Sequence, residues 1–143
     1  MITDTRIETN KVIAQRFIEE VFEQGDEAAV DELVASDFVP HNWATGARGP
    51  DAVKKAIERA HTGLEDAHLK IEDVFGEDDR VAVRLTSTAR QTGEFMGLPP
   101  SGKTYEIEEI HVFRIADGKV AEHWHQGDFL TMFRQLGATP PSA

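Results

Sequence analysis

The 143-residue chain contains no cysteine. This excludes disulfide bonds, thiolate nucleophiles and cysteine-ligated metal sites. Basic residues are also scarce, with 15 Lys and Arg against 26 Asp and Glu, which gives a formal net charge of −11. Because a polyanion repels phosphate groups, we expect neither nucleic acid nor an anionic membrane surface as a partner.

Long apolar runs are absent too, and no stretch approaches the length that crosses a bilayer. The segment from Met1 to Gln15 is polar and charged, unlike the apolar core of a secretory signal peptide. Hydrophobic residues make up 40% of the chain and charged residues 29%, a composition typical of a soluble globular protein. We therefore expect a cytoplasmic location and one domain with one hydrophobic core.

Amphipathic helices are expected in the first half of the chain. Apolar residues recur at helical spacing from Ile7 to Phe22, which predicts a first helix. Asp26 is a typical N-cap for a second helix, and Pro50 fits the first turn of a third helix over residues 51–61. The apolar residues of the second helix are Ala29, Val30, Leu33 and Val34.

The hydrophobic period changes from helical to two after the third helix, which predicts strands. The expected strands are Leu69–Asp73, Val81–Thr88, Tyr105–Ile115 and Lys119–Gln126. A short helix over 129–136 and a frayed tail over 139–143 would close the chain. Helices followed by an antiparallel meander define the α+β class, and a curved sheet over helices leaves a cavity for a small ligand.

The last predicted hairpin gathers the reactive side chains on one face. Residues 115–119 fit a three-residue loop with a left-handed glycine, which would place His111 opposite His123 and Glu109 opposite His125. Because side chains alternate along a strand, these four share one face of the sheet. A two-residue loop would instead shift the register and separate His111 from His125.

The opposite face of this hairpin is expected to be apolar, with one ion pair. Its members are Ile110, Val112, Val120 and Trp124, with Arg114 and Glu122 able to pair. An antiparallel sheet with two apolar faces needs a second cover, so we expect a homodimer.

Three interpretations of the histidine cluster remain open. The four side chains could be solvated polar residues on an exposed face. They could form a pocket wall with acid/base groups, in which Glu109 would raise the pKa of His125 above the ordinary histidine value. They could also bind zinc or iron, although we expect no metal.

Five further residues are candidates for contact with a ligand. His41 and Asn42 follow an apolar run, where the alternative is an exposed turn. Asp128 follows the last strand and would either orient a histidine or cap the closing helix. Phe95 and Met96 lie between glycines and would form an apolar lid or pack on a neighbouring subunit.

Several segments resemble the SnoaL-like polyketide cyclases of the NTF2-like superfamily in order and spacing, over about residues 9–137. They are Asp37-Phe38, His41-Asn42, Gly49-Pro50, Gly93–Gly102, Ile110–Val120 and Phe133–Gly137. The resemblance implies an NTF2-like cone, a curved antiparallel sheet around N-terminal helices, as a single domain over 1–143. It also implies a homodimer.

The resemblance further implies ring closure of an aromatic polyketide ester by intramolecular aldol condensation, without metal or organic cofactor. Family members are similar in carrying a histidine at His111. Their acid/base aspartate aligns with His125, and a substrate-holding glutamine aligns with Glu109, so this chain departs at both positions. A histidine can still act as a general acid/base.

The resulting hypothesis is a cofactor-independent cyclase for a small hydrophobic carbonyl compound. His125, His111 and Glu109 would be catalytic, and His41, Asn42, His123, Asp128, Phe95 and Met96 would bind substrate. The alternatives are a small-molecule-binding protein without catalysis, or another NTF2-like reaction such as isomerisation or epoxide hydrolysis.

Overall fold

A computed structural model describes residues 4–138, so the expected tail over 139–143 lies outside it. Most of the helices come before the strands in the sequence. The helices are α1 (Thr5–Arg16), its π-helical continuation η1 (Phe17–Glu23), α2 (Glu27–Leu33), α3 (Gly49–Gly63) and α4 (Phe129–Gln135). The strands are β1 (Val34–Pro40), β2 (Leu64–Glu77), β3 (Arg80–Gln91), β4 (Thr104–Ala116) and β5 (Lys119–Gly127).

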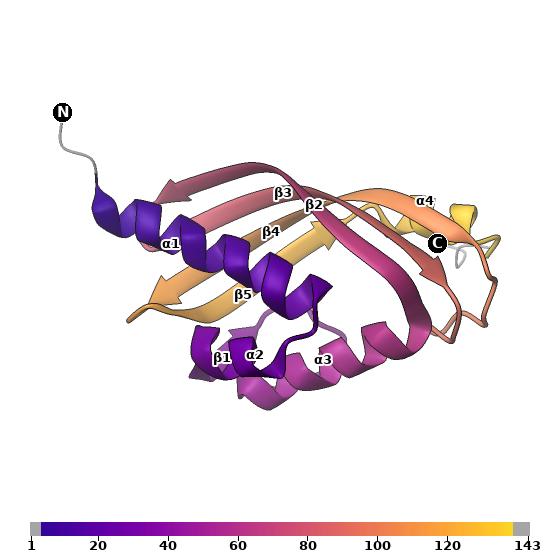
Figure 1. Cartoon of the computed structure of the whole chain (residues 1–143), viewed down its shortest axis with the longest axis horizontal. Helices are drawn as coiled ribbons and strands as arrows, with labels where there is room; N and C mark the ends of the chain where they lie inside the picture. Colours follow the sequence, from indigo (N-terminus) through magenta and orange to yellow (C-terminus); the bar gives the residue numbers. More distant parts are fainter. Residues whose placement is uncertain (1–3, 139–143) are drawn as a thin grey trace.

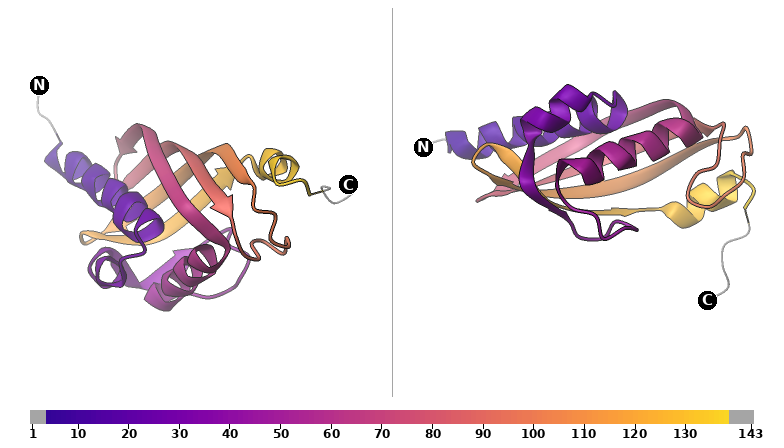
Figure 2. Two further views of the ribbon diagram at one scale, coloured as in Figure 1. Left: turned by 45° about the vertical axis from the view of Figure 1, so that its right-hand side comes forward. Right: turned by 90° about the horizontal axis from the view of Figure 1, so that it is seen from below.

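The five strands form one curved sheet in the order β1-β5-β4-β3-β2. Figures 1 and 2 show α1, α2 and α3 lying against one face of the sheet, with α4 at one end. The expected α+β cone is therefore confirmed. Within the described residues, no helix covers the face of the sheet opposite the three helices, as the view from below in Figure 2 shows.

The predicted helices are present because local capping and packing agree. The Asp26 side chain accepts hydrogen bonds from the backbone N–H groups of Ala28 and Ala29, so it caps α2 as expected. The first helix extends through the π-helical turn η1, in which Phe17, Ile18 and Val21 are buried. The Phe17 ring packs edge-on against Phe113 of β4, and this contact joins the helices to the sheet.

Strand β1 was not expected from the sequence, which predicted that Val34 continues the second helix. In the structure Val34 instead begins a strand that pairs in parallel with β5, where Val34 lies opposite Val120 and Pro40 opposite His123. The sheet is therefore mixed and not a simple antiparallel meander. The sequence pattern could not show this pairing, because the two strands lie more than 80 positions apart.

The β4–β5 hairpin corrects the predicted loop and register. The turn has two residues, Asp117 and Gly118, both with positive φ (51° and 75°), which is the geometry of a type I′ turn. A bulge at Ala121 then adds one residue to β5. Relative to the predicted pairing, the turn and the bulge each shift the register by one residue. The net shift of two places His111 opposite His125 and not opposite His123.

Beyond the bulge, the register shift of two residues leaves each side chain on its predicted face, because side chains alternate with period two. Between the turn and the bulge the faces differ from the prediction. Val120 pairs with Ile115, and both are buried in the core, so the expected position of Val120 on the outer face is wrong.

The hydrophobic core has two parts. The larger part lies between the N-terminal helices and the sheet and contains the fully buried rings of Phe17, Phe38 and Phe113. The smaller part, which includes Tyr105 and Met132, lies beneath α4. Residues of both parts line a pocket on the inner side of the sheet, among them Ile57 of the larger part and Met132 of the smaller one.

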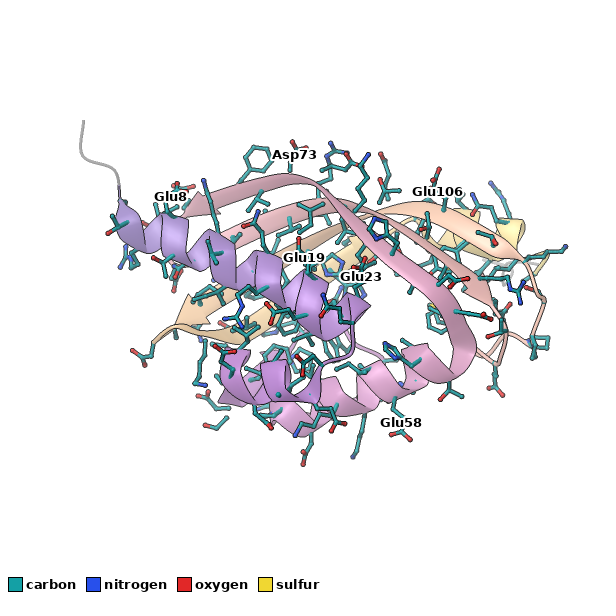
Figure 3. The ribbon with its side chains drawn as sticks, viewed as in Figure 1. Glu8, Glu19, Glu23, Glu58, Asp73 and Glu106 are labelled. Atoms are coloured by element: carbon teal, nitrogen blue, oxygen red, sulfur yellow. The ribbon has the colours of Figure 1, made fainter. Side chains whose placement is uncertain are left out.

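Acidic side chains are spread around the surface and do not form one patch. Figure 3 labels six of them, on α1, η1, α3, β2 and β4. Within residues 4–138, no helix is both long enough and apolar enough to cross a membrane.

Candidate active site

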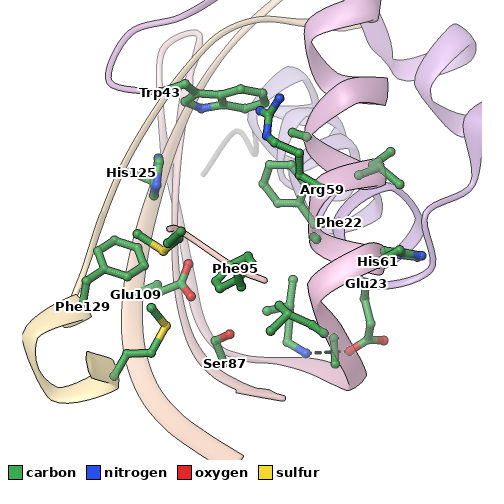
Figure 4. Close-up of a pocket in the computed structure, with 18 of the residues that line it drawn as sticks. Phe22, Glu23, Trp43, Arg59, His61, Ser87, Phe95, Glu109, His125 and Phe129 are labelled. Atoms are coloured by element: carbon green, nitrogen blue, oxygen red, sulfur yellow. Dashed lines mark hydrogen bonds between the residues drawn. The ribbon is translucent and has the colours of Figure 1, made fainter. Parts of the chain in front are cut away.

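A pocket of about 620 Å³ lies between η1, α3 and the inner face of the sheet. Its lining is mostly apolar, with aromatic rings on several sides, as Figure 4 shows. The aromatic side chains are Phe22, Trp43, Phe95, Tyr105 and Phe129. A cavity of this size, with a few polar groups on apolar walls, has the character of a small-molecule site.

The predicted face of the last hairpin forms one wall of this pocket. Glu109, His111, His123 and His125 all line it, so the prediction that they look into a cavity is confirmed. Strands β4 and β5 position them because inward-facing residues alternate with outward-facing ones. The interpretation as solvated residues on an exposed face is wrong, since His111 and His123 are 3% and 0% exposed.

A continuous hydrogen-bonded chain runs through this wall. Trp43 Nε1 donates to His123 Nδ1 over 2.9 Å, and His123 Nε2 lies 2.8 Å from His111 Nδ1. His111 Nε2 lies 2.9 Å from Oε1 of Glu109. Burial lowers the pKa of His123 well below its ordinary value, so His123 is neutral at neutral pH.

His125 is the histidine of this wall that remains outside the chain. Its ring stacks on that of His111 at 5.5 Å, and its buried Nδ1 has no hydrogen-bond partner among the described residues. Asn42 holds the strand at this point, since its side chain bonds both the backbone N–H and the carbonyl of His125.

The pKa of His125 is lower than the ordinary histidine value, and burial is the main cause. The nearby Glu109 carboxylate acts in the opposite direction and raises it. The expectation that Glu109 would lift this pKa above the ordinary value is therefore wrong, because desolvation outweighs the carboxylate. At neutral pH His125 presents an uncharged imidazole.

Two of the predicted ligand-binding residues lie away from the pocket. His41 stacks on Trp124 at 4.5 Å and binds Glu122 at 2.7 Å, which places it with the outer face of β5. Asp128 caps α4, accepting hydrogen bonds from the backbone N–H and the hydroxyl of Thr131. Neither side chain lines this pocket, because each finds a partner in its own surroundings, and the capping role that the sequence offered for Asp128 is confirmed.

The other predicted contacts lie at the pocket. Asn42, Phe95 and Met96 all line it, and the last two belong to the 92–103 loop between β3 and β4. The buried side chain of Gln91 anchors this loop, donating to the Leu98 carbonyl and accepting from the Ser101 hydroxyl.

The sequence analysis missed many of the lining residues, among them Trp43, Arg59 and Ser87. Ser87 could have been found, because it shares its face of β3 with the buried Leu85. Trp43 and Arg59 come from a bend and from α3, and Figure 4 shows them at one end of the pocket. No periodic pattern points to either, since their position depends on contacts with distant elements.

The histidine chain also bears on the metal interpretation. All four ring nitrogens of His111 and His123 are engaged in hydrogen bonds. Within residues 4–138, no three His, Asp or Glu side chains are arranged to hold a metal ion. A zinc or iron ion here would have to break the buried chain, at the cost of unpaired polar groups.

The fold and this wall of acid/base groups agree with a comparison against known families. The chain belongs to the SnoaL-like polyketide cyclase family, whose model matches residues 12–136.

Two curated relatives are ester cyclases of Streptomyces. The aklanonic acid methyl ester cyclase DnrD of Streptomyces peucetius is 33% identical over 96 residues, 66% of each chain. The chain thus spans just under two thirds of the length of that relative. The nogalonic acid methyl ester cyclase of Streptomyces nogalater is 30% identical over 119 residues, covering 81% of this chain and 89% of the relative.

A solved structure supports the same family relationship. TsrD from Streptomyces laurentii is 29% identical and superposes with a TM-score of 0.84, covering 97% of this chain and 100% of TsrD. The predicted family resemblance and fold are therefore both confirmed.

Proposed function

We propose that this chain is a cofactor-independent cyclase that closes a ring in a small, hydrophobic, polyketide-like ester by intramolecular aldol addition. The observation that carries the proposal is the unpartnered, uncharged His125 imidazole beside Glu109 on the wall of an apolar pocket. A neutral imidazole that has no other partner is available to take and return a proton. The ester cyclases among the relatives support the same reaction class.

The proposed reaction moves one proton twice. His125 takes a proton from a carbon flanked by carbonyl groups, and the C–H electron pair becomes an enolate. The enolate carbon attacks a second carbonyl carbon of the same molecule, which forms the ring bond and leaves an alkoxide. The imidazolium returns the proton to the alkoxide, so the product is an isomer of the substrate. No water, electron or cofactor is consumed.

The neighbouring side chains complete this mechanism. The Glu109 carboxylate favours the charged form of His125, so it stabilises the imidazolium that forms during the reaction. Tyr105 also lines the pocket, and burial raises its pKa, so it keeps a phenolic proton that it can donate to a substrate carbonyl. Phe95 and Met96 would cover the substrate, and Asn42 would hold the strand that carries His125.

Replacing His125 tests the proposal. A panel of small β-keto esters would be screened for isomerisation by chromatography and mass spectrometry. With a converted substrate, His125→Ala should lower kcat by about two to four orders of magnitude, the usual contribution of one positioned acid/base. His125→Asp should retain more activity than His125→Ala, because a carboxylate can serve as the same base.

The control is His68→Ala, since His68 is an exposed histidine that does not line the pocket. Its kcat should match that of the wild type. An unchanged rate in His125→Ala would assign the proton transfer to another residue. Tight binding of the panel without conversion would instead favour the small-molecule-binding alternative.

We further propose a cytoplasmic homodimer that needs no metal. The outer face of the sheet supports the dimer, because Phe75, Ala82, Val112 and Trp124 are cross-strand neighbours in one row. Phe75 is 64% exposed and nearby Ile110 is 50% exposed, so burial against a second copy would remove apolar surface from water. Elemental analysis of untagged protein tests the metal proposal, and a stoichiometric transition metal would contradict it.

A further inference from the structure

The indole N–H of Trp43 gives a direction to the whole buried histidine chain. An indole nitrogen can only donate a hydrogen bond, so His123 Nδ1, 2.9 Å away, must accept and carries no proton. Neutral His123 therefore has its proton on Nε2 and donates to His111 Nδ1 over 2.8 Å. His111 in turn has its proton on Nε2 and donates to the Glu109 carboxylate over 2.9 Å. One tautomer of each histidine satisfies every contact.

A second proton on His111 does not fit this chain. It would place an N–H on His111 Nδ1 directly against the N–H of His123 Nε2. Turning His123 into its other tautomer would only move the conflict to Trp43, whose N–H cannot accept. A buried donor without an acceptor is unfavourable, because it loses its hydration and gains no hydrogen bond in return.

The surroundings offer no alternative partner for that proton. His123 is fully buried, and the rings of Phe17, Phe22 and Phe113 pack around it. The titratable groups that face His111 are His123, Glu109 on the same strand and His125 on the neighbouring strand. The first two are already in the chain, and His125 stacks ring on ring, which leaves no room for a hydrogen bond between them.

We propose that Trp43 is a positioning residue that acts through His123 to lock His111 as the neutral Nε2–H tautomer. The locked His111 holds the Glu109 carboxylate at the pocket wall, and of the three histidines on this wall His125 alone is left to exchange protons. The lock itself is independent of the proposed function, whereas its catalytic consequence rests on it. His111 and His123 thus become positioning residues, in place of the catalytic and substrate-binding roles predicted from the sequence.

Side-chain nitrogen spectra test the lock without any substrate. In ¹⁵N-histidine-labelled protein, long-range ¹H–¹⁵N correlations report which ring nitrogen carries the proton. In the wild type at about pH 8, where an ordinary histidine is neutral, His111 and His123 should both be Nε2–H tautomers. An Nδ1–H tautomer of either residue would overturn the proposal even if no variant folds.

Trp43→Phe keeps an aromatic ring and removes the N–H. Both histidines should then become tautomer mixtures at the same pH. Trp124→Phe is the matched control, because Trp124 lies on the outer face, and it should leave the spectra of His111 and His123 unchanged. If Trp43→Phe retains the wild-type tautomers, Trp43 is not the lock.

Two variants at His123 test whether the direction of the hydrogen bonds, and not simply the packing of the side chain, sets the His111 tautomer. In His123→Gln the amide oxygen can accept from Trp43 and the amide N–H can donate to His111, so the His111 tautomer should be retained. His123→Leu removes both contacts and should release it. With a converted substrate, His123→Gln should keep kcat within about threefold, and His123→Leu should lower it at least about tenfold. Equal tautomers in the two variants would refute the lock, whereas failure to find any substrate would count only against the proposed function.

Discussion

At the scale of single residues, burial decides the chemistry of the His125 imidazole. Removal of the ring from water lowers its pKa, whereas the nearby Glu109 carboxylate raises it, and removal from water is the larger effect. In the proposed reaction His125 therefore starts as a neutral base and becomes a cation when it takes a proton from the substrate.

This pKa shift predicts the pH dependence of turnover. The active form is the neutral imidazole, so kcat should rise with pH through the lowered pKa of His125. The midpoint of this rise should lie below about pH 6.5, the ordinary histidine value. A pH profile of kcat for a converted substrate measures this limb. The limb should disappear in His125→Ala, and a limb above the ordinary value would show that the carboxylate outweighs burial.

His123 predicts a pH dependence of stability. Its pKa is lowered in the folded protein, so the unfolded chain binds a proton at this residue more readily than the folded chain does. Its contribution to stability is fully present above about pH 6.5 and is lost progressively as pH falls below that value toward the lowered pKa. The free energy of unfolding, measured in urea between about pH 7.5 and about pH 5.5, should therefore fall.

The comparison variant for that measurement is His123→Gln, which has no titrating group. Its free energy of unfolding should depend less on pH over the same range. Parallel curves for the two proteins would assign the acid sensitivity to other groups.

At the scale of elements, the β4–β5 hairpin places the site. Its two-residue turn and its bulge each shift the register by one, and their sum returns His111 and His125 to the same face. A turn of two residues without the bulge would have put these side chains on opposite faces. The bulge at Ala121 is therefore as important for the site as the histidines themselves.

Gly118 tests the turn. Its φ is 75°, a left-handed conformation that costs a residue with a side chain about 1–2 kcal/mol. Gly118→Ala should lower the free energy of unfolding by that amount, because no neighbouring atom would clash with the new Cβ and strain is the main effect. Urea titration measures it.

Gly46→Ala is the matched control. Gly46 also has open space around its Cα, and its φ lies outside the left-handed region. Its free energy of unfolding should change by less than about 0.5 kcal/mol. Equal effects at the two glycines would show that Gly118 does not define the turn.

At the scale of the whole molecule, the inner face of the sheet lines the pocket and its outer face carries the proposed dimer surface. Alternate residues of β4 and β5 point either into the pocket or outward. The outward set forms the apolar row with Phe75, and ion pairs border it, including Arg84 with Asp73 and Arg114 with Glu122. A dimer through this face would leave the pocket of each copy open to ligand, because the pocket lies on the other side of the sheet.

Ile110→Lys tests this dimer. A charge at the centre of the outer face would be buried without a partner, so the variant should be a monomer by light scattering at micromolar concentration, whereas the wild type should be a dimer. Val12→Lys is the control, since Val12 is similarly exposed (52%) but lies on α1. It should remain a dimer. A monomeric wild type would contradict the proposal directly.

Much of this protein can be predicted from local pattern. Helical spacing, the cap at Asp26 and the first-turn proline Pro50 specify the helices, and the period of two specifies the long strands, because these signals depend on neighbours within a few positions. The same alternation predicted which face carries Glu109, His111 and His125. Family motifs placed them in a cyclase-like site.

Features that depend on contacts between distant positions were decided by the tertiary structure. The pairing of β1 with β5, the bulge at Ala121 and the contact from Trp43 to His123 all join positions whose partners the chain brings together only on folding. The pKa of His125 belongs to the same group, because desolvation depends on everything packed around the ring. The amino-acid sequence therefore determined which side chains share the wall. Folding determined their proton positions, since those depend on burial and on one distant N–H.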